Sequence, residues 1–435
     1  MSTALTRNPA AATRRTLSAP LAYALAASVV AVALFGSATP SPLYETYREL
    51  WGFSPVVLTL VYATYAFGVL TSLILAGRIS DEVGRRPVLL AALGALMAAT
   101  VAFMLADSLA WLFVARGIQG LATGLALSAA SAALLDLHPR RDPTGVGLTN
   151  GVVSAGGLGL GVLVSAVFVQ LLPAPRVLPY VALFVLVAIA FAGALRMPEP
   201  VEPRTRLRLT PQRPSVPSAV RGPFLLAALG VISSWSIGGL FLALGPQLSA
   251  VLLDTTNHLV SGISVFALAA SGSLAQVAFG RTAPWVGAAG GSIALSAGLL
   301  LIVLSASTES SVLLLTGSVI GGAGFGVAFL GALRALSVAI PPDQRAAVMS
   351  AFYVVAYASL SLPAILAGVF VTPLGLESTF EIFGSVVGAL ALVVAFEAWR
   401  TRPRAEELAA GRGGEPRRAA PAVSRACTES AADTA

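Results

Sequence analysis

The sequence alternates between long apolar stretches and short polar segments. Each apolar stretch holds about twenty residues or more, which is enough to cross the hydrocarbon core of a bilayer as an α-helix. Twelve such stretches are present, with approximate bounds at residues 19–40, 56–76, 88–106, 110–137, 145–171, 177–195, 223–252, 259–279, 284–305, 311–340, 346–371 and 379–399. The pattern predicts an all-α membrane protein with twelve transmembrane helices.

The polar segment at residues 197–222 is the one long interruption inside this series. It is rich in proline and arginine and lacks apolar periodicity. It therefore predicts a cytoplasmic linker between two halves of six helices each, residues 19–196 and 223–400. Residues 1–18 form a polar N-terminal tail, and residues 401–435 form a polar C-terminal tail that we expect to be disordered.

Several landmarks of the first half recur in the second half at a nearly constant spacing. The recurring pairs, always about 203 residues apart, are Gly77-Arg78 with Gly280-Arg281, Gly120 and Gly124 with Gly322 and Gly326, Pro139 with Pro341, and Pro42 with Pro246. The glycine pairs have the G-x-x-x-G spacing that lets helices approach closely. The repeat predicts two similar six-helix bundles.

All 27 basic residues are arginines, and they gather at alternate polar segments. With a cytoplasmic N-terminus, only Arg48 and Arg176 fall in outside loops, while Arg116 and Arg334 fall within helices. The positive-inside rule therefore places both termini in the cytoplasm. The arginines do not line a soluble face with aromatic residues between them, so the formal net charge of +7 indicates topology and no nucleic-acid partner.

Residues 1–40 also fit a cleaved signal peptide, because basic residues precede an apolar core and Gly36-Ser37-Ala38 resembles a cleavage site. The core is longer than that of a usual signal, and similar apolar stretches continue the pattern after it. We therefore expect residues 19–40 to remain as the first transmembrane helix.

The composition excludes several classes of active site. Hydrophobic residues make up 56% of the chain and charged residues 11%. The only cysteine is Cys427, and the only histidines are His138 and His258, both beside loops. An intrachain disulfide is impossible, and a thiolate or histidine metal site or a histidine-based catalytic triad is not expected. We expect no enzyme activity, no catalytic residues, no metal and no cofactor.

Residues 77–90, GRISDEVGRRPVLL, form a dense polar connection between the second and third apolar stretches. Its glycines permit tight turns, its acid can complement a helix N-terminus, and its arginine can bridge nearby carboxylates. The segment resembles the signature loop of the major facilitator superfamily of transporters, G-x-L-x-D-x-x-G-R-R, with Ile79 where leucine is usual. The matching positions are Gly77, Asp81, Gly84, Arg85 and Arg86. The resemblance implies a substrate site near the midplane, between two halves that rock about it.

A second motif extends the resemblance. Arg116-Gly117-Ile118-Gln119-Gly120 is similar to the superfamily's R-x-x-Q-G motif. An arginine about 9 Å into a helix, at about 1.5 Å per residue, is costly in a membrane unless it is paired or hydrated. Gln119 lies about one turn further on the same face. The resemblance implies a role for Arg116 in proton or substrate handling, and helix packing against backbone carbonyls is the alternative.

Asp136 ends the fourth helix at the cytoplasmic face. We expect it to pair with Arg85 in a network with Asp81 that holds the cytoplasmic gate shut, as the resemblance implies. A helix-end acid that faces water is the alternative. For Arg334 we favour a structural role, in which its long side chain extends to the cytoplasmic interface of the membrane.

The fifth helix is rich in glycine at residues 151–161 and resembles the superfamily's antiporter motif. The proline expected after the central glycine is missing, which weakens the inference of an antiporter.

Aromatic residues on helices expected to border the cavity are candidates for stacking on a ligand or orienting it. They are Tyr62, Tyr65, Trp235, Phe352, Tyr353 and Tyr357. The middles of the first and seventh helices have no acid, although many proton-coupled drug exporters carry one there. The possible proton carriers are Glu45, Asp254 and Glu381, and each also fits a solvated loop acid. A cavity with few acids favours neutral or amphiphilic substrates.

Together these features predict a secondary transporter that works by alternating access and exports a small drug-like or metabolite molecule, coupled to protons. Uptake or facilitated transport of a sugar, an organic acid or a similar solute is the alternative. A channel or a structural membrane protein would not require the repeat or the signature loop. We expect a monomer in the inner (plasma) membrane of a prokaryote.

Overall fold

The computed structural model describes residues 16–76, 79–201, 214–341 and 344–402. Within those ranges every regular element is a helix. The chain divides into two compact units, residues 1–400 and 401–435, and the helices belong to the first. Gly77, the linker residues 202–213 and the tail beyond residue 402 lie outside the described residues, so the expectations placed on them stay untested.

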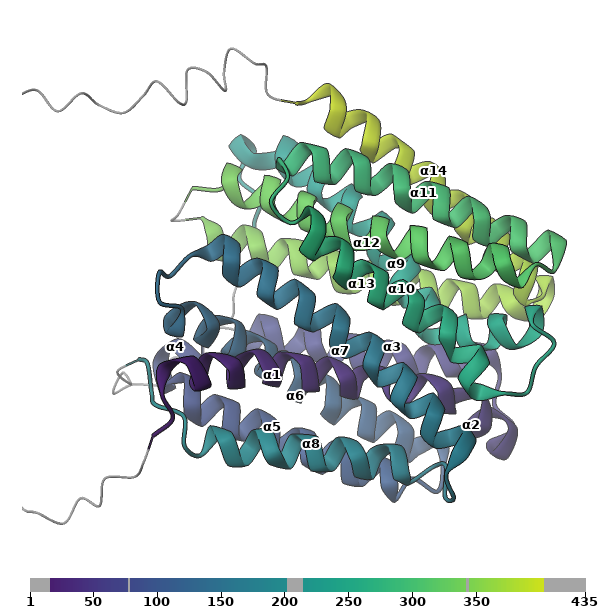
Figure 1. The fold of residues 1–435 in the computed structure, drawn as a ribbon, viewed down its shortest axis with the longest axis horizontal. Coiled ribbons are helices and arrows are strands. Elements are labelled where there is room, and N and C mark those ends of the chain that lie inside the picture. The colour runs from purple at the N-terminus through teal and green to yellow at the C-terminus, as the bar shows by residue number, and fades with distance from the viewer. Residues whose placement is uncertain (1–15, 77–78, 202–213, 342–343, 403–435) are drawn as a thin grey trace, which may run out of the picture. The chain divides into compact units, whose positions relative to one another are not determined.

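Before the linker the chain forms long helices interrupted by short ones (Figure 1). The long helices are α1 (Ala19–Ala38), α3 (Pro55–Ala76), α5 (Arg85–Met104), α6 (Leu109–Leu137), α7 (Pro143–Leu171) and α8 (Leu178–Ala194). The short ones are η1 (Ser41–Leu43), α2 (Tyr44–Trp51) and α4 (Ile79–Val83).

After the linker the same kind of helix continues. The elements are η2 (Ser218–Val220), α9 (Arg221–Leu252), α10 (His258–Phe279), α11 (Pro284–Thr308), α12 (Ser311–Ala339), α13 (Arg345–Leu374) and α14 (Leu376–Arg400).

Eleven helical segments among the described residues are long and apolar enough to cross a membrane. The stretch expected at residues 177–195 forms α8, which is apolar but only 17 residues long. The first of the eleven runs from Ala19 to Trp51, because η1 and α2 extend α1. The sequence pattern did not predict this extension, since the polar residues of α2 interrupt the apolar run.

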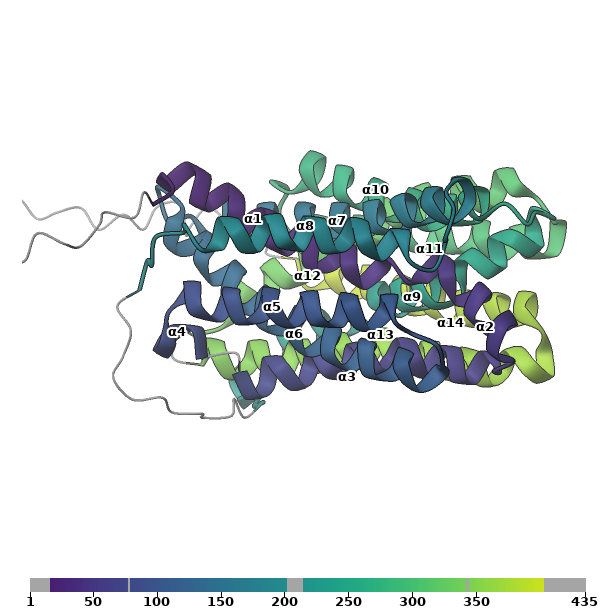
Figure 2. The ribbon, with the colours of Figure 1, turned by 90° about the horizontal axis from the view of Figure 1, so that it is seen from below.

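Two pairs of helices join the parts of the chain before and after the linker. α7 packs against α10, and α3 packs against α13. These pairs lie near opposite edges of the view in Figure 2. Within each part, α5 packs against α6 and α8, while α11 packs against α12 and α14. The two interfaces leave space between them for a central site.

The glycine pairs of the repeat are points of close helix approach. A Cβ at Gly120 would overlap the backbone oxygen of Tyr65 on α3, and a Cβ at Gly322 would overlap that of Leu268 on α10. Because neither glycine has a side chain, α6 lies directly on α3 and α12 lies directly on α10. These contacts fix the helices that carry the site.

Candidate functional site

A cavity of about 570 Å³ lies between the helices that precede the linker and those that follow it. Its walls come from α1, α3, α6 and α7 on one side and from α9, α10, α12 and α13 on the other. The volume suits a small organic molecule, because ligand pockets usually measure about 300–1,000 Å³. The lining reaches Ile74 and Met349, close to the end of the molecule that carries the signature loop.

Five of the aromatic candidates line this cavity: Tyr62, Tyr65, Trp235, Tyr353 and Tyr357. The ring centroid of Trp235 lies 5.2 Å from that of Tyr357 in an edge-to-face arrangement and 5.5 Å from that of Phe329. Phe352 is different, because it is fully buried in an apolar cluster behind the wall and does not line the cavity. α3, α9 and α13 therefore present an aromatic wall to a ligand.

The wall formed by α6, α7 and α10 carries uncharged polar side chains among apolar ones. It includes Ser131, Asn150, Ser154 and Gln276, and Ser131 Oγ donates a hydrogen bond to Asn150 Oδ1 at 3.2 Å. Gly151 leaves space for the Gln276 amide, which a Cβ at that position would overlap. We did not predict this wall from the sequence. The signal that would have found it is an amide side chain near the end of an apolar span, as at Asn150 and Gln276.

Charged groups are absent from the described residues that line the cavity. The three acids considered as proton carriers lie elsewhere. Glu45 on α2 forms an ion pair with Arg48. Asp254 follows α9 in a left-handed backbone conformation, with a φ of 43°, and Glu381 lies on α14. The structure therefore does not bring these acids together with the aromatic candidates.

Arg116 on α6 is 1% exposed and makes hydrogen bonds only to neutral acceptors in the described part of the chain. Its Nε donates to Tyr44 Oη at 2.9 Å, and its Nη1 donates to the backbone oxygen of Ser37 at 2.9 Å and to Gln119 Oε1 at 2.6 Å. A second bond to Tyr44 comes from Nη2. The guanidinium also lies over the Tyr65 ring, 5.2 Å from its centroid. Arg116 therefore has no ion-pair partner among the described residues, and it lies against the ring of Tyr65, which lines the cavity.

The signature loop forms a charged network around Arg85. Arg85 Nε donates to Asp136 Oδ2 at 2.9 Å, and Arg85 Nη1 donates to Asp81 Oδ1 at 2.5 Å and to Ser80 Oγ at 2.8 Å. The expected contact between Arg85 and Asp136 is thus present. All four residues lie on α4, α5 and α6, so these bonds stay within the part of the chain before the linker. The network is present although the cavity lining extends toward this same end, so these bonds alone do not close that end of the cavity.

Glu199, which follows α8, caps the N-terminus of α5. Its Oε1 accepts from the backbone N–H of Arg85 at 2.8 Å, and its Oε2 accepts from that of Arg86 at 2.9 Å. A carboxylate at a helix N-terminus is favourable because it satisfies free N–H groups and the helix dipole. Gly84 has a φ of 108° and leaves room for this carboxylate. Arg86 Nη2 adds a 2.5 Å bond to the backbone oxygen of Leu195. Sequence patterns missed Glu199, since over a hundred residues separate it from the loop.

The end of the cavity beside α2 is closed by apolar packing. One buried cluster joins Leu43 and Tyr47, from η1 and α2, to Leu244 and Leu248 of α9. The same cluster continues into α3, α10 and α13. We call this cluster around Leu43, Tyr47, Leu244 and Leu248 the roof of the cavity. It closes one end of the cavity and joins the parts of the chain on either side of the linker.

A hydrogen bond within this roof depends on a proline. Pro246 lies inside α9 and has no N–H, so the backbone oxygen of Leu242, four residues earlier, lacks its usual helical partner. Ser41 Oγ from η1 donates to that oxygen at 2.6 Å. Leu242 itself lines the cavity. The proline thus provides an acceptor on α9 for a side chain that lies 201 residues earlier in the sequence.

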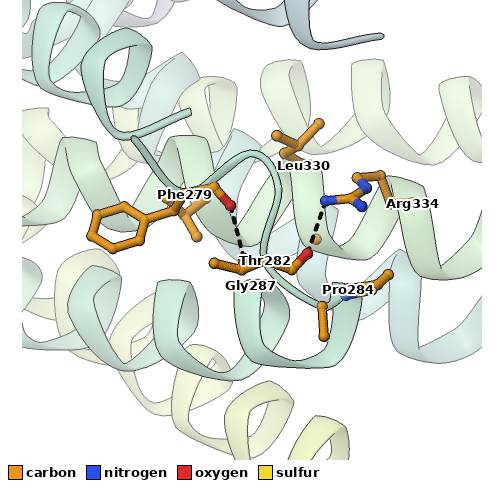
Figure 3. A pocket seen from close by; sticks show the side chains of 9 residues that line it. Phe279, Thr282, Pro284, Gly287, Leu330 and Arg334 are labelled. Atoms are coloured by element: carbon orange, nitrogen blue, oxygen red, sulfur yellow. Dashed lines mark hydrogen bonds between the residues drawn. The ribbon is translucent and has the colours of Figure 1, made fainter. Parts of the chain in front are cut away.

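Arg334 on α12 has a structural role at the turn between α10 and α11 (Figure 3). Its Nη1 donates to the backbone oxygens of Gly280 at 2.6 Å and Thr282 at 3.0 Å. The recess beside it measures about 10 Å³, roughly the space of one water molecule. Arg334 therefore stabilises the turn that begins at Gly280-Arg281, which is the second-half counterpart of Gly77-Arg78 in the signature loop. This turn contains no acid.

Comparisons with known proteins identify the same transporter superfamily that the signature loop resembles. The family model of the Major Facilitator Superfamily matches residues 26–362. No curated protein matches in sequence. The fold is similar to the crystal structure of the human organic anion transporter MFSD10 (TETRAN), with a TM-score of 0.64, 16% identity, and coverage of 88% of this chain and 100% of that one. The chain therefore belongs to the major facilitator superfamily.

Proposed function

We propose that this protein is a secondary active transporter that works by alternating access and exports a small drug-like or metabolite molecule in exchange for protons. Members of the superfamily are membrane transporters. The observation that carries the proposal is the cavity of about 570 Å³, which is roofed at one end and extends toward the other. Such a cavity gives a solute access from one side at a time.

The topology is part of the proposal. We count α8 as the twelfth membrane-spanning helix, since its 17 residues fit the lower end of the usual range. Two six-helix bundles then pack through the α3–α13 and α7–α10 pairs. The excess of arginines places the signature loop and both termini in the cytoplasm. On this assignment the described state faces the cytoplasm, and the protein is a monomer of the inner (plasma) membrane.

The direction of transport and the coupling to protons depend on a group that can carry the proton. Proton exchange needs a group that titrates, and Glu45, Asp254 and Glu381 are the candidates named from the sequence. The absence of an acid among the described lining residues favours a second candidate function, which is uptake or facilitated transport without protons. The human structural neighbour is described as an organic anion transporter, so organic anions belong among the compounds to be screened.

The experiment is a screen in energised inside-out vesicles that contain the full chain. Substrate-triggered collapse of the pH gradient would be measured for cationic dyes, neutral antibiotics, sugars, and aromatic and aliphatic organic anions. We expect one class to respond, and an uncoupler should abolish its accumulation. Compounds that equilibrate across the membrane without disturbing the gradient would instead establish a facilitator.

Two matched variants test whether the cavity carries the flux. Ser154→Trp places a bulky ring in the cavity wall, whereas Val338→Trp places the same ring on an 83% exposed position of α12. We expect Ser154→Trp to abolish transport and Val338→Trp to preserve it. Equal transport by both well-expressed variants would show that solute does not pass through this cavity.

A further inference from the structure

We propose that the transported molecule is an aromatic organic anion, whose rings pack against Trp235 and Tyr357 and whose charged end lies near Tyr62 and Tyr65, in front of Arg116. This inference rests on the proposed transport function and names the chemical class of its substrate. Three separate features of the cavity support it: an uncompensated charge, an aromatic wall, and polar atoms without partners.

The charge comes from Arg116. Its hydrogen-bond acceptors are a tyrosine hydroxyl, a backbone oxygen and an amide, and no carboxylate pairs with it in the described part of the chain. The guanidinium lies 5.2 Å from the centroid of the Tyr65 ring, and Tyr65 lines the cavity. At a distance of about 10 Å and an effective dielectric constant of about 20, one unit of ligand charge changes the dissociation constant by about tenfold. The field therefore favours an anion and disfavours a cation.

No compensating charge faces the ligand from within the cavity. The described lining residues include no Asp, Glu, Arg or His, so Arg116 sets the sign of the local potential. A cationic substrate would need a carboxylate partner, because a buried charge without a partner is strongly unfavourable. An anion, by contrast, would lower the cost of burying Arg116 itself.

The ring system of the substrate is inferred from the aromatic wall. Trp235, Tyr357 and Phe329 already pack edge-to-face or tilted, at centroid distances of 5.2 and 5.5 Å. Tyr65 and Tyr353 extend the wall along α3 and α13. Aromatic pairs gain energy beyond the burial of their area, and rigid rings lose little conformational entropy. A planar aromatic ligand fits this wall better than a flexible chain or a sugar.

Two donors on the wall have no hydrogen-bond partner among the described protein groups. They are Tyr62 Oη and Trp235 Nε1, and both residues line the cavity. The two polar atoms are buried in this state, so each side chain must change its rotamer to present them to a ligand. A buried donor without a partner is unfavourable, so an anionic oxygen that accepts from either one gains a charge-assisted hydrogen bond. A carboxylate supplies such oxygens.

The test compares three probes with the same naphthalene ring, binding to the purified full chain. They are 2-naphthoate, its uncharged amide 2-naphthamide, and the cationic amine 2-(aminomethyl)naphthalene. We expect 2-naphthoate to bind about tenfold more tightly than the amide, with the amine weakest. Tyr62→Phe removes the phenol donor and keeps the ring, and it should weaken 2-naphthoate at least about fivefold, with a smaller effect on the amide. Trp235→Phe removes the indole N–H together with one of the two fused rings, so it should weaken both probes, and 2-naphthoate more than the amide. The matched control is Trp111→Phe, because Trp111 is 40% exposed and lies outside the cavity lining.

Several results would overturn the inference. They are equal or tighter binding of the amine, no binding of any probe, or unchanged binding of 2-naphthoate in both cavity variants. Transport is measured separately by counterflow in proteoliposomes. Counterflow of the amine or the amide without a preference for 2-naphthoate would preserve the transport function and reject the anion. Selective binding of 2-naphthoate without counterflow would reject the transport function and preserve the anion site.

Discussion

Ser41→Ala tests the closed end of the cavity directly. In the described state Ser41 is 4% exposed, and its Oγ is the side-chain partner of the Leu242 backbone oxygen. Pro246 cannot supply the N–H that would otherwise satisfy that oxygen. The substitution therefore leaves a buried carbonyl unsatisfied, and only while the roof is closed. If the roof opens, water reaches the carbonyl in both proteins.

The magnitude follows from that difference. A buried acceptor that loses its partner costs about 1–3 kcal/mol, which corresponds to about 5- to 150-fold in an equilibrium constant. We expect Ser41→Ala to shift the population by that factor toward a state open at the α2 end. Pro246→Ala should reduce the effect, because the restored N–H gives the Leu242 oxygen a helical partner. The two changes should therefore be non-additive.

The shift can be measured as a distance between spin labels across the roof. Labels at Asp107→Cys and Thr256→Cys, on loops of the two parts of the chain and in a Cys427→Ser background, report opening by double electron–electron resonance. Ser28→Ala is the matched control, since Ser28 Oγ bonds only within α1, to the Leu25 backbone oxygen at 2.8 Å. Identical distance distributions for Ser41→Ala and the parent would refute the reasoning. An equally large effect in the Pro246→Ala background would refute the role of the proline.

The remaining predictions concern the loop, the arginine and the helix seams. Asp81→Asn removes an ion pair between the exposed Asp81 and the buried Arg85, which keeps Asp136 as its partner, so the melting temperature should fall only slightly while transport in proteoliposomes falls sharply; normal transport would exclude a gating role. Glu199→Gln weakens two charge-assisted hydrogen bonds at the start of α5 and should lower the free energy of unfolding by about 1–3 kcal/mol. The melting temperature should fall accordingly, and an unchanged melting temperature would show that the cap is dispensable. Arg116→Ala should weaken 2-naphthoate binding about tenfold in a direct titration, and parental affinity would remove the residue from the site. Gly120→Ala should destabilise the fold by about 1–3 kcal/mol through overlap with α3, whereas Gly290→Ala, which meets only open space, should have no such effect in the same melting assay.

Local sequence patterns predicted much of the fold. Apolar runs of about twenty residues located the long helices, because each spanning helix must satisfy its own backbone groups. The signature loop could be identified because its glycines and charges are closely spaced. The contact between Arg85 and Asp136 was also accessible from the sequence, since both residues lie at the same end of adjacent helices.

Contacts between distant segments could not be predicted in this way. Glu199 reaches the start of α5 across more than a hundred residues, and Ser41 reaches Leu242 across 201 residues. The short helix α2 contains polar residues, so it interrupts the apolar pattern while continuing the helical segment. The wall that includes Asn150 was missed because isolated polar residues in an apolar span do not indicate which neighbour they face.

The neutral surroundings of Arg116 also bear on the energy source for transport. The guanidinium of Arg116 is bonded to protein groups, so its charge stays in the protein when the solute crosses the membrane. The net charge moved across the bilayer in each cycle is then set by the substrate and by any coupled ion. A membrane potential contributes about 2.3 kcal/mol per elementary charge at 100 mV, which sustains a concentration ratio of about fiftyfold. In a cell with a negative interior, voltage alone would drive a monoanion outward, without an acid in the cavity.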